Sequence, residues 1–600
     1  MDARVLTKAV MGTPRFAPAL TSRAPLEGGG FVLRSPVLLG EVPRCVSDLL
    51  VRWAAEAPAR TFLAERDASG AWRKVTYAET LAAARVLGQE LLDHGLGPGR
   101  PLLILSANAI DQALLSLACM HVGVPVAPVS PAYSLVSKDF AKLRTLAQIL
   151  EPAAIYAAPA PKYDEAIAAL DLDVPRITVP PDITSASASA SLPAVDAALA
   201  RIGPDTIAKV LFTSGSTGSP KGVVNTQRML CSNQQAIAST WLFLAERPPV
   251  VVDWLPWSHT FGANHNFFMV LWHGGTLYID EGKPAPGAFD ATLKNLREVS
   301  PTVYFNVPSG FDMLVARLEE DPELAQAFFR DLDLLFYAAA ALSQPTWARL
   351  EEVSRRTRGS KVTMVSAWGS TETSPLVTQV HFPIDRAGVI GLPVPGCELA
   401  FVPAGGGGDK LEMRVKGPNV SPGYWRAGGS IEPSARDEDG FYPMGDAGRL
   451  ADDAAPERGV VFDGRTAENF KLSTGTWVHV GELRIAVVGA CAPLLQDAVV
   501  TGHDRDAIGL LLFASPEGQR HPDLAGELRA RIAAFNVARP GTSCRVARAM
   551  LVADPPSIDA GEITDKGYIN QRAVLDRRAA LVERLHGADA PDVIRPCAGL

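Results

Sequence analysis

The chain has 600 residues, of which 47% are hydrophobic and 20% are charged, and its formal net charge is -8. This composition excludes a disordered protein. The mildly acidic balance also argues against a general nucleic-acid binder, whose affinity would come from neutralising phosphates. The length predicts several structural units around a core that needs neither disulfides nor a structural metal. We therefore expect a medium-large enzyme.

The sequence carries no signal for export or for membrane insertion. Its seven cysteines lie far apart without a CxxC pair, which is typical of reduced thiols in a cytoplasm. No apolar run follows the basic residues near the N-terminus, so we expect no secretory signal. The most apolar stretch, residues 113–129, contains His121, Gly123 and two prolines and is short for a bilayer span. These features predict a cytoplasmic protein without a transmembrane segment.

Strands and helices are expected to alternate in the N-terminal part of the chain. Residues 72–75 have the character of a strand, and Thr76 with Glu79 forms a capping box that starts a helix ending near Gly95. The series continues with a strand over residues 101–105, a helix over 110–122 and a strand over 125–129. Alternation of this kind predicts an α/β fold with parallel sheets covered by helices.

Three segments are expected to lack regular structure. Residues 1–40 are rich in Pro and Gly and predict an irregular leader. Residues 184–191, TSASASAS, predict a low-complexity surface loop, and the four glycines at 405–408 predict a turn. None of the three is expected to carry function.

A domain boundary is expected near Gly464. New strand and helix signals follow it, including candidate helices over residues 523–535 and 571–585. The boundary divides the chain into residues 1–464 and 465–600, the second being a smaller α+β unit.

The most specific motif is VLFTSGSTGSPKG, residues 210–222, in which an apolar strand runs into hydroxyls and glycines and then a lysine. Glycines let backbone N–H groups turn towards an anion, hydroxyls donate to phosphate oxygens, and the lysine supplies charge. A Walker loop is excluded, because Pro220 precedes Lys221 and Gly222 follows it. A Ser/Gly-rich surface loop seldom has this order behind a buried strand. We therefore expect a phosphate-binding loop made of Thr213, Ser214, Gly215, Ser216, Thr217, Gly218 and Lys221.

This loop resembles the signature of the adenylate-forming superfamily, which includes acyl- and aryl-CoA synthetases, adenylation domains and beetle luciferases. The resemblance runs from about residue 50 to 572 and implies a large N-terminal lobe of helix-covered sheets with a distorted barrel. A small, mobile α+β C-terminal domain is implied after it. The superfamily's other motifs follow in its order, as DWLPWSHTFG (253–262), SAWGSTE (366–372), KGPNVSPGYW (416–425), GFYPMGD (440–446) and FDGR (462–465).

The resemblance implies that ATP binds at the second, fourth and fifth of these motifs. Trp368, where Tyr is usual, offers a flat face to adenine beside Gly369. Thr371 can donate to a phosphate, and Glu372 is a hard oxygen ligand for Mg²⁺. The implied ribose contacts are Asp446 and Arg465. Taken alone, Trp368 would be a core packing residue.

Two further segments depart from the superfamily pattern. Ala339 and Ala340 stand where a glycine-containing adenine loop is usual. Whether a ligand can approach the backbone closely at these alanines is left open. Ala467 stands where the hinge usually has Asp or Lys, so the pivot residue is open as well. Lys471 and Gly475 resemble positions that enter the site in the thioester-forming state.

The acid pocket is expected around the motif that contains His259, which flanks the carboxylate pocket in relatives. In isolation this His would more often be an ordinary structural histidine. Motif proximity gives Phe261, Asn264, Tyr337 and Trp368 as further wall residues. Aromatic walls with a few polar groups suit a flat aromatic acid, while an aliphatic acid stays open.

The C-terminal lysine of the superfamily is expected to stabilise charge that builds between carboxylate and α-phosphate. Here Tyr568 stands at the usual lysine register and Lys566 lies two residues earlier. We assign the role to Lys566, with a different lysine or none as alternatives.

Two segments, GEITDKGYINQRAVL and GRTAENFKLSTGTWV, resemble bacterial feruloyl-CoA synthases. The implied reaction is ATP-dependent ligation of an aromatic acid of the hydroxycinnamic class, with ferulic acid as the first candidate, to coenzyme A, with release of AMP and pyrophosphate. The implied catalytic residues are Lys566, His259, Thr213 and Glu372. ATP, Mg²⁺ and coenzyme A are the implied cofactors. Another aryl or fatty acid, a carrier-protein acceptor, or a nucleotide-binding pseudoenzyme stay open, as does a homodimer.

Overall fold

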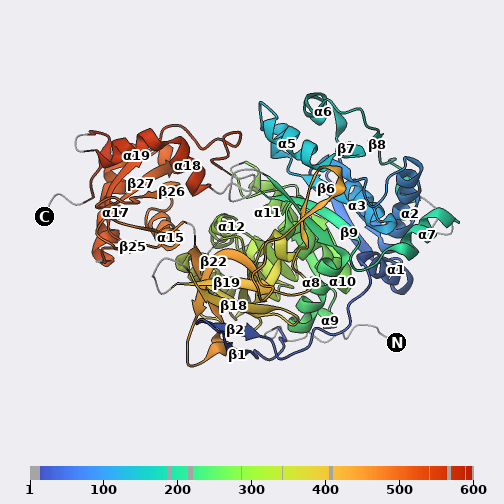
Figure 1. Ribbon diagram of the computed structural model, residues 1–600, viewed down its shortest axis with the longest axis horizontal. Coiled ribbons are helices and arrows are strands. Elements are labelled where there is room, and N and C mark those ends of the chain that lie inside the picture. The colour runs from blue at the N-terminus through green and yellow to red at the C-terminus, as the bar shows by residue number, and fades with distance from the viewer. Residues whose placement is uncertain are drawn as a thin grey trace.

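The computed structural model describes residues 14–185, 191–213, 220–285, 287–340, 342–404, 410–466, 468–539, 541–563, 569–587 and 590–596. Three sheets and their helices form a large N-terminal lobe, and a small C-terminal unit lies beside it (Figure 1). The architecture is the α/β class expected from the alternating elements. None of the helices in these ranges combines the length and the apolar character that a bilayer crossing requires.

An eight-stranded sheet carries the phosphate-loop motif. Its central strands are parallel and connected through helices, and they are buried on both faces, which explains their continuous apolar sequences. Its strands, in spatial order, are β21 (Ile431–Pro433), β20 (Gly423–Trp425), β10 (Lys221–Thr226), β9 (Ile207–Thr213), β6 (Val126–Val129), β5 (Leu102–Ser106), β7 (Ala154–Ala158) and β8 (Arg176–Ile177).

An eleven-stranded sheet carries the adenine and ribose motifs. Strands β13, β14 and β15 are parallel, and the remaining neighbours are antiparallel. The antiparallel half is the part of the lobe for which the resemblance implied a distorted barrel. The order is β1 (Ser22–Pro25), β2 (Phe31–Arg34), β18 (Glu398–Pro403), β19 (Leu411–Lys416), β22 (Tyr442–Leu450), β23 (Val460–Arg465), β17 (Val389–Pro393), β16 (Leu376–Gln379), β15 (Thr363–Gly369), β14 (Leu334–Tyr337) and β13 (Val303–Asn306).

A four-stranded sheet and several helices complete the lobe. The sheet has the order β11 (Val250–Asp253), β12 (Thr276–Ile279), β3 (Thr61–Arg66) and β4 (Trp72–Thr76). The helices used below are α1 (Val46–Glu56), α2 (Tyr77–Asp93), α3 (Ile110–Val122), α5 (Ala141–Leu150), α8 (Gln227–Thr240), the π-helix η3 (Phe261–Phe267), α10 (Phe268–His273), α11 (Phe289–Glu298), α12 (Pro308–Glu320), α13 (Pro322–Phe329) and α14 (Gln344–Arg358).

The C-terminal unit has its own sheets and its own core. Its apolar cluster joins β26 and β27 to α15 and α17. We keep the division between residues 464 and 465 as a proposal; β23 itself ends at Arg465. The elements are β24 (Phe470–Lys471), β25 (Trp477–Val478), α15 (Val480–Ala490), β26 (Leu495–Thr501), β27 (Ile508–Ala514), α17 (Leu524–Ala538), β28 (Val546–Leu551), α18 (Gln571–Arg577), α19 (Ala579–His586) and β29 (Val593–Ile594).

The early elements follow the sequence expectation closely. The capping box at the start of α2 is confirmed: the Thr76 hydroxyl accepts from the Glu79 N–H at 3.2 Å, and the Glu79 carboxylate accepts from the Thr76 N–H at 2.7 Å. Helix α3 covers the predicted residues 110–122. The six cysteines in the described ranges are all unpaired, as expected.

The expectation of an irregular leader over residues 1–40 is wrong in part. Strands β1 and β2 pair with each other, and β2 also pairs with β18 at the edge of the large sheet. Glycines at 28, 29 and 30 adopt positive φ between the two strands, a conformation that glycine accepts without steric cost. Residues 1–13 lie outside the described ranges.

The expected single helix over residues 571–585 is also wrong. Two helices, α18 and α19, are separated at Arg578, whose φ is -103° and ψ is 29°. The Arg578 side chain donates to the buried carboxylate of Glu562. No local sequence pattern predicts this interaction.

Candidate active site

The two strands that flank the phosphate-loop motif pair with each other. Strands β9 and β10 are antiparallel neighbours, and Thr213 lies opposite Lys221. These two predicted site residues are therefore close in space. Ser214, Gly215, Ser216, Thr217 and Gly218 lie outside the described residues.

Lys221 and Glu372 meet at one tyrosine. The Lys221 ammonium lies over the ring of Tyr424, 4.9 Å from its centroid. The Tyr424 hydroxyl is 3.5 Å from Oε1 of Glu372, whose other oxygen accepts from Ser370 Oγ at 2.9 Å. Strand β20, which carries Tyr424, pairs with β10. The structure thus brings a cation and a carboxylate from distant motifs to one place.

Trp368, Asp446 and Arg465 form a second group. The indole N–H of Trp368 donates to Asp446 Oδ2 at 2.9 Å, and Arg465 Nε lies 3.0 Å from Oδ1. Asp446 and Arg465 are also cross-strand partners on β22 and β23. Burial raises the pKa of the Asp446 carboxyl, while Arg465 and the indole N–H oppose that rise.

The two groups lie close together. Tyr442, on the same strand as Asp446, shares a 3.0 Å hydroxyl–hydroxyl hydrogen bond with Tyr424. Burial and the nearby Glu372 charge raise the pKa of Tyr442 well above its usual range, so this hydroxyl stays protonated. The Glu372 charge also contributes to the raised pKa of Asp446. The β9–β10 pair, Glu372 and Asp446 therefore share one region.

Gly369 is required where it stands. A Cβ atom there would lie 1.6 Å from the Pro375 carbonyl oxygen, far inside contact distance. The chain then forms the short 3-10 turn η4 (Thr371–Thr373), in which Thr371 is buried. Because the backbone approaches so closely here, Trp368 near the end of β15 is followed within five residues by Thr371 and Glu372 of η4.

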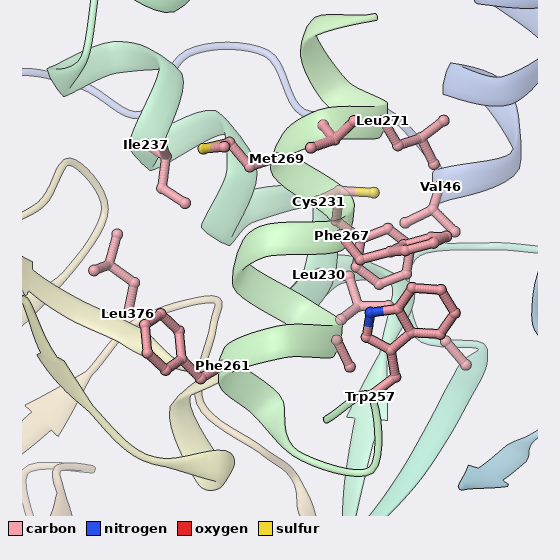
Figure 2. Packing of buried hydrophobic residues seen from close by; sticks show 14 of the residues in the cluster. Val46, Leu230, Cys231, Ile237, Trp257, Phe261, Phe267, Met269, Leu271 and Leu376 are labelled. Carbon is pink, nitrogen blue, oxygen red and sulfur yellow. The ribbon is translucent and has the colours of Figure 1, made fainter. Parts of the chain in front are cut away.

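His259 lies two residues before the first residue of the π-helix η3, which carries Phe261 and Asn264. Its Nδ1 accepts from the Phe261 N–H at 3.3 Å. Phe261 points to Leu376 of β16, away from Trp257 and Phe267 (Figure 2). The segment that begins at His259 therefore extends towards β16, the strand that follows the Trp368 motif.

Phe261 belongs to a buried aromatic group together with His265, Phe305 and Phe336. Ring centroids of Phe261 and Phe336 are 5.5 Å apart, and those of His265 and Phe336 are 5.0 Å apart. Tyr337 lies in a different apolar cluster, against Trp347 of α14. The structure brings Phe336 rather than Tyr337 to Phe261, because successive residues of a strand face opposite sides.

Ala339 with Ala340 and Lys471 with Gly475 are two further predicted pairs. Ala339 adopts a φ of 73°, a conformation that favours the glycine usual there, and both Ala339 and Ala340 are exposed. Lys471 and Gly475 lie on the β24–β25 hairpin, with the Lys471 ammonium over Trp477. Lys566 and Ala467 lie outside the described residues.

Sequence reasoning missed Lys209 of β9. Its side chain is buried, its ammonium donates to Asn264 Oδ1 at 3.4 Å and lies 4.5 Å from the Phe268 ring centroid. Asn264 in turn donates to Asn225 Oδ1 at 2.8 Å and to Thr260 Oγ1 at 3.1 Å. This network ties β9 and β10 to the segment of His259. A lone lysine inside the apolar run IAKVLFT was the available signal.

Lys209→Met is expected to remove a pH dependence of stability. Burial lowers the pKa of Lys209 to about 7, against roughly 10.4 in an unfolded chain. Between these values the unfolded chain binds more protons, so the wild-type free energy of unfolding rises with pH. The variant should show a flatter rise in denaturant unfolding from about pH 7 to about pH 10.

Lys74→Met is the matched control, because Lys74 is an exposed strand lysine. This control should retain the wild-type slope. An unchanged slope in Lys209→Met would mean that the buried amine is charged in the folded protein.

Comparison with known proteins gives consistent results over most of the chain. Residues 50–425 match the family described as AMP-binding enzyme, and residues 470–589 match the AMP-binding enzyme C-terminal domain. A long-chain-fatty-acid–CoA ligase, FadD15 of Mycobacterium bovis, is 25% identical over 88% of this chain and 94% of its own length. An anthranilate–CoA ligase of Pseudomonas aeruginosa is 27% identical over 65% of this chain and 71% of its own.

The fold has close relatives among solved structures. The anthranilate CoA ligase AuaEII in complex with anthranoyl-AMP superposes with a TM-score of 0.69 at 18% identity. The match covers 90% of this chain and 98% of that one. At this identity the likeness concerns the fold.

Proposed function

The chain belongs to the AMP-binding enzyme family, and we propose that it is an ATP-dependent acid–CoA ligase for an aromatic acid of the hydroxycinnamic type, with ferulic acid as the first candidate. The observation that carries the proposal is the meeting of Lys221, Glu372 and Asp446 from three separate motifs in one region. The relatives named as CoA ligases support the same class of reaction.

The proposed reaction has two steps. A carboxylate oxygen of the acid attacks the α-phosphorus of ATP, the bond to the bridging oxygen breaks, and pyrophosphate leaves. The sulfur of coenzyme A then attacks the acyl carbon, and the bond to AMP breaks. The thiol proton passes to solvent. No nucleophilic side chain of the protein takes part, so the protein acts by positioning and charge stabilisation.

The described residues divide this work. Thr213 and Lys221 hold the phosphates at the base of β9 and β10. Asp446 accepts hydrogen bonds from the ribose hydroxyls, and its partner Arg465 orients the ribose. Trp368 is held by its hydrogen bond to Asp446, which fixes the indole beside the nucleotide. His259 flanks the acid carboxylate. Together these groups align the acid with the α-phosphate.

A magnesium ion fits the acidic group present. Mg²⁺ in nucleotide sites is usually held by one or two carboxylates together with substrate phosphates and waters. Glu372 is half-buried, and its Oε1 lies 3.5 Å from the Tyr424 hydroxyl. The described residues contain no cluster of three or more His, Cys, Asp or Glu side chains placed to hold a metal, so Glu372 would hold the ion with ATP. The ion would neutralise charge on the phosphates.

Two observations favour an aromatic acid. The buried group of Phe261, His265, Phe305 and Phe336 includes Phe261, two residues after His259, and supplies apolar ring surfaces. The anthranilate–CoA ligase relative acts on an aromatic acid by its name. The resemblance of two C-terminal segments to feruloyl-CoA synthases narrows the proposal to hydroxycinnamates. The fatty-acid ligase relative makes a long-chain acid the alternative.

We also propose that residues 465–600 rotate between the two steps. One nucleotide site must serve two different reactions, and a moving cap can exchange the groups that face it. Lys566 would face the site during adenylate formation, and Lys471 with Gly475 during thioester formation. A cytoplasmic location and a homodimer stay predictions.

A panel of acids tests the substrate proposal. Purified protein with ATP, Mg²⁺ and coenzyme A is assayed for thioester formation with ferulate, p-coumarate, caffeate, benzoate and a long-chain fatty acid. We expect the highest kcat/KM with ferulate or p-coumarate. A preference for the fatty acid would overturn the aromatic assignment, and no ATP–pyrophosphate exchange with any acid would overturn the ligase.

A further inference from the structure

The side-chain amide of Asn264, on the π-helix η3, is held at both ends by one pair of strands. Lys209 of β9 and Asn225 of β10 are cross-strand partners. The Lys209 amine donates to Asn264 Oδ1 at 3.4 Å, and Asn264 Nδ2 donates to Asn225 Oδ1 at 2.8 Å. No more than 5% of any of the three residues is exposed. We call Lys209, Asn225 and Asn264 the bracket.

The two strands of the bracket also carry the first and last residues of the phosphate site. Thr213 lies opposite Lys221, four residue pairs along the same ladder from Lys209 and Asn225, and the pairing between them is regular. Side chains alternate along a strand, so Lys209 and Thr213 face the same side of β9. At 3.3 Å per residue they are about 13 Å apart. The place of Asn264 is therefore set relative to Thr213 by a continuous piece of sheet.

The bracket reaches two further segments of the site. Asn264 Nδ2 donates to Thr260 Oγ1 at 3.1 Å, and Thr260 directly follows His259. Ser374 Oγ lies 3.5 Å from the same Nδ2, and Ser374 comes two residues after Glu372. Segments assigned to the phosphates, to the acid and to the metal ion thus meet at one buried amide.

A lysine is a costly side chain to place inside this apolar strand. Burial lowers the pKa of Lys209 to about 7, which shows how strongly the surroundings disfavour its charged form. An apolar side chain would fill the same space without that cost. The amine is nevertheless directed at the amide that joins the site segments, which indicates that its value lies in the hydrogen bond and not in packing.

We propose that Lys209 and Asn225 are positioning residues for adenylate formation. Through Asn264 they set how far the carboxylate of the acid lies from the α-phosphate of ATP. The inference rests on the proposed function. Attack requires the reacting atoms to be held at about 3 Å in the correct orientation, and a displacement of about 1 Å is costly. Asn264, which is committed at both ends to protein partners, acts as the link between the two substrate sites and not as a wall of the acid pocket.

Lys209→Met tests the positioning role, because methionine keeps an unbranched apolar chain and loses the donor. With ferulate and ATP both saturating, kcat for ATP–pyrophosphate exchange should fall by about tenfold to a hundredfold, the cost of a small misplacement. The Kd of ATP measured without acid should stay at the wild-type value, since the phosphate strands are unchanged. Lys209→Gln, which keeps a donor, should recover part of kcat. A loss that appears in KM alone would overturn the positioning role.

Stability separates positioning from a merely structural role, which predicts that activity and stability fall together. At pH 7 Lys209→Met should unfold at no lower urea concentration than wild type, because at this pH only the unfolded chain keeps the amine fully protonated. Ser354→Ala is the matched control. Ser354 is buried in α14 and donates to the Ser360 carbonyl at 2.9 Å, and its variant should exchange pyrophosphate at the wild-type rate. A destabilised Lys209→Met, or equal losses of kcat in both variants, would overturn the proposal.

A double-mutant cycle shows whether Lys209 acts through Asn264. Asn264→Leu should lower kcat by a factor similar to that of Lys209→Met. The double variant Lys209→Met/Asn264→Leu should be no slower than Asn264→Leu alone, because the link is already broken. Losses of the two single variants that multiply in the double variant would assign them separate roles and overturn the proposal.

Hydrogen exchange on the full chain separates the bracket from the proposed function. Lys209→Met should raise amide exchange at residues 260–266, whereas Ser354→Ala should leave it unchanged. A wild-type protein that adenylates no acid would overturn the proposed function, while faster exchange of these amides in Lys209→Met would still support the bracket. Unchanged exchange at residues 260–266 in Lys209→Met would overturn the bracket whatever the activity.

Discussion

Glu372→Gln is expected to lower acid-dependent ATP–pyrophosphate exchange by about 10²–10³-fold, the usual cost of removing one preorganised charge-stabilising group. The glutamine keeps the size of the side chain and an oxygen for the Ser370 and Tyr424 hydroxyls. It loses the negative charge that would hold Mg²⁺ beside the phosphates. The loss should appear at saturating acid and should shrink as Mg²⁺ is raised, because a weaker site fills at higher concentration.

Glu432→Gln is the matched control for this experiment. Glu432 is the exposed cross-strand partner of Tyr424. It lies in the same sheet, and its carboxylate forms an ion pair with Arg426. Exchange in Glu432→Gln should stay at the wild-type rate. Equal losses in the two variants would show that any acid near Tyr424 matters, and the assignment of Glu372 would fall.

Local sequence patterns were sufficient for the elements that depend on neighbours along the chain. The capping box needs only Thr76 and Glu79 three residues apart, and α3 begins and ends where its apolar run does. Strands β1 and β2 were not predicted because each has four residues and β2 is held by pairing with β18, in which Glu398 lies 364 positions after Arg34. The helical pattern of residues 571–585 is interrupted at Arg578, whose side chain donates to Glu562, 16 positions away in the sequence.

Motifs in the sequence identified which segments belong to the site but not which face each side chain takes. Phe336 and Tyr337 are adjacent and both aromatic, and only the pleat of β14 decides which one reaches Phe261. The indole of Trp368 was expected to offer its face, and the structure adds a use for its N–H at Asp446. Lys209 escaped because an apolar strand gives no reason to expect a buried amine with an amide partner.

Lys566→Ala is expected to lower adenylate formation by about 10²–10³-fold and to spare thioester formation from a supplied acyl-adenylate. The ammonium would oppose the negative charge that builds as the carboxylate approaches the α-phosphate, a charge that is absent from the second step. Exchange of pyrophosphate into ATP measures the first step, and release of AMP from the adenylate in the presence of coenzyme A measures the second.

Lys471→Ala supplies the opposite comparison. Lys471 is exposed on the β24–β25 hairpin, where its ammonium lies over Trp477, and the proposed rotation brings it to the site only for the second step. Its loss should slow thioester formation and leave pyrophosphate exchange unchanged. Normal adenylation by Lys566→Ala would assign the role to another lysine, and the shifted register at Tyr568 would then mark a real departure in mechanism.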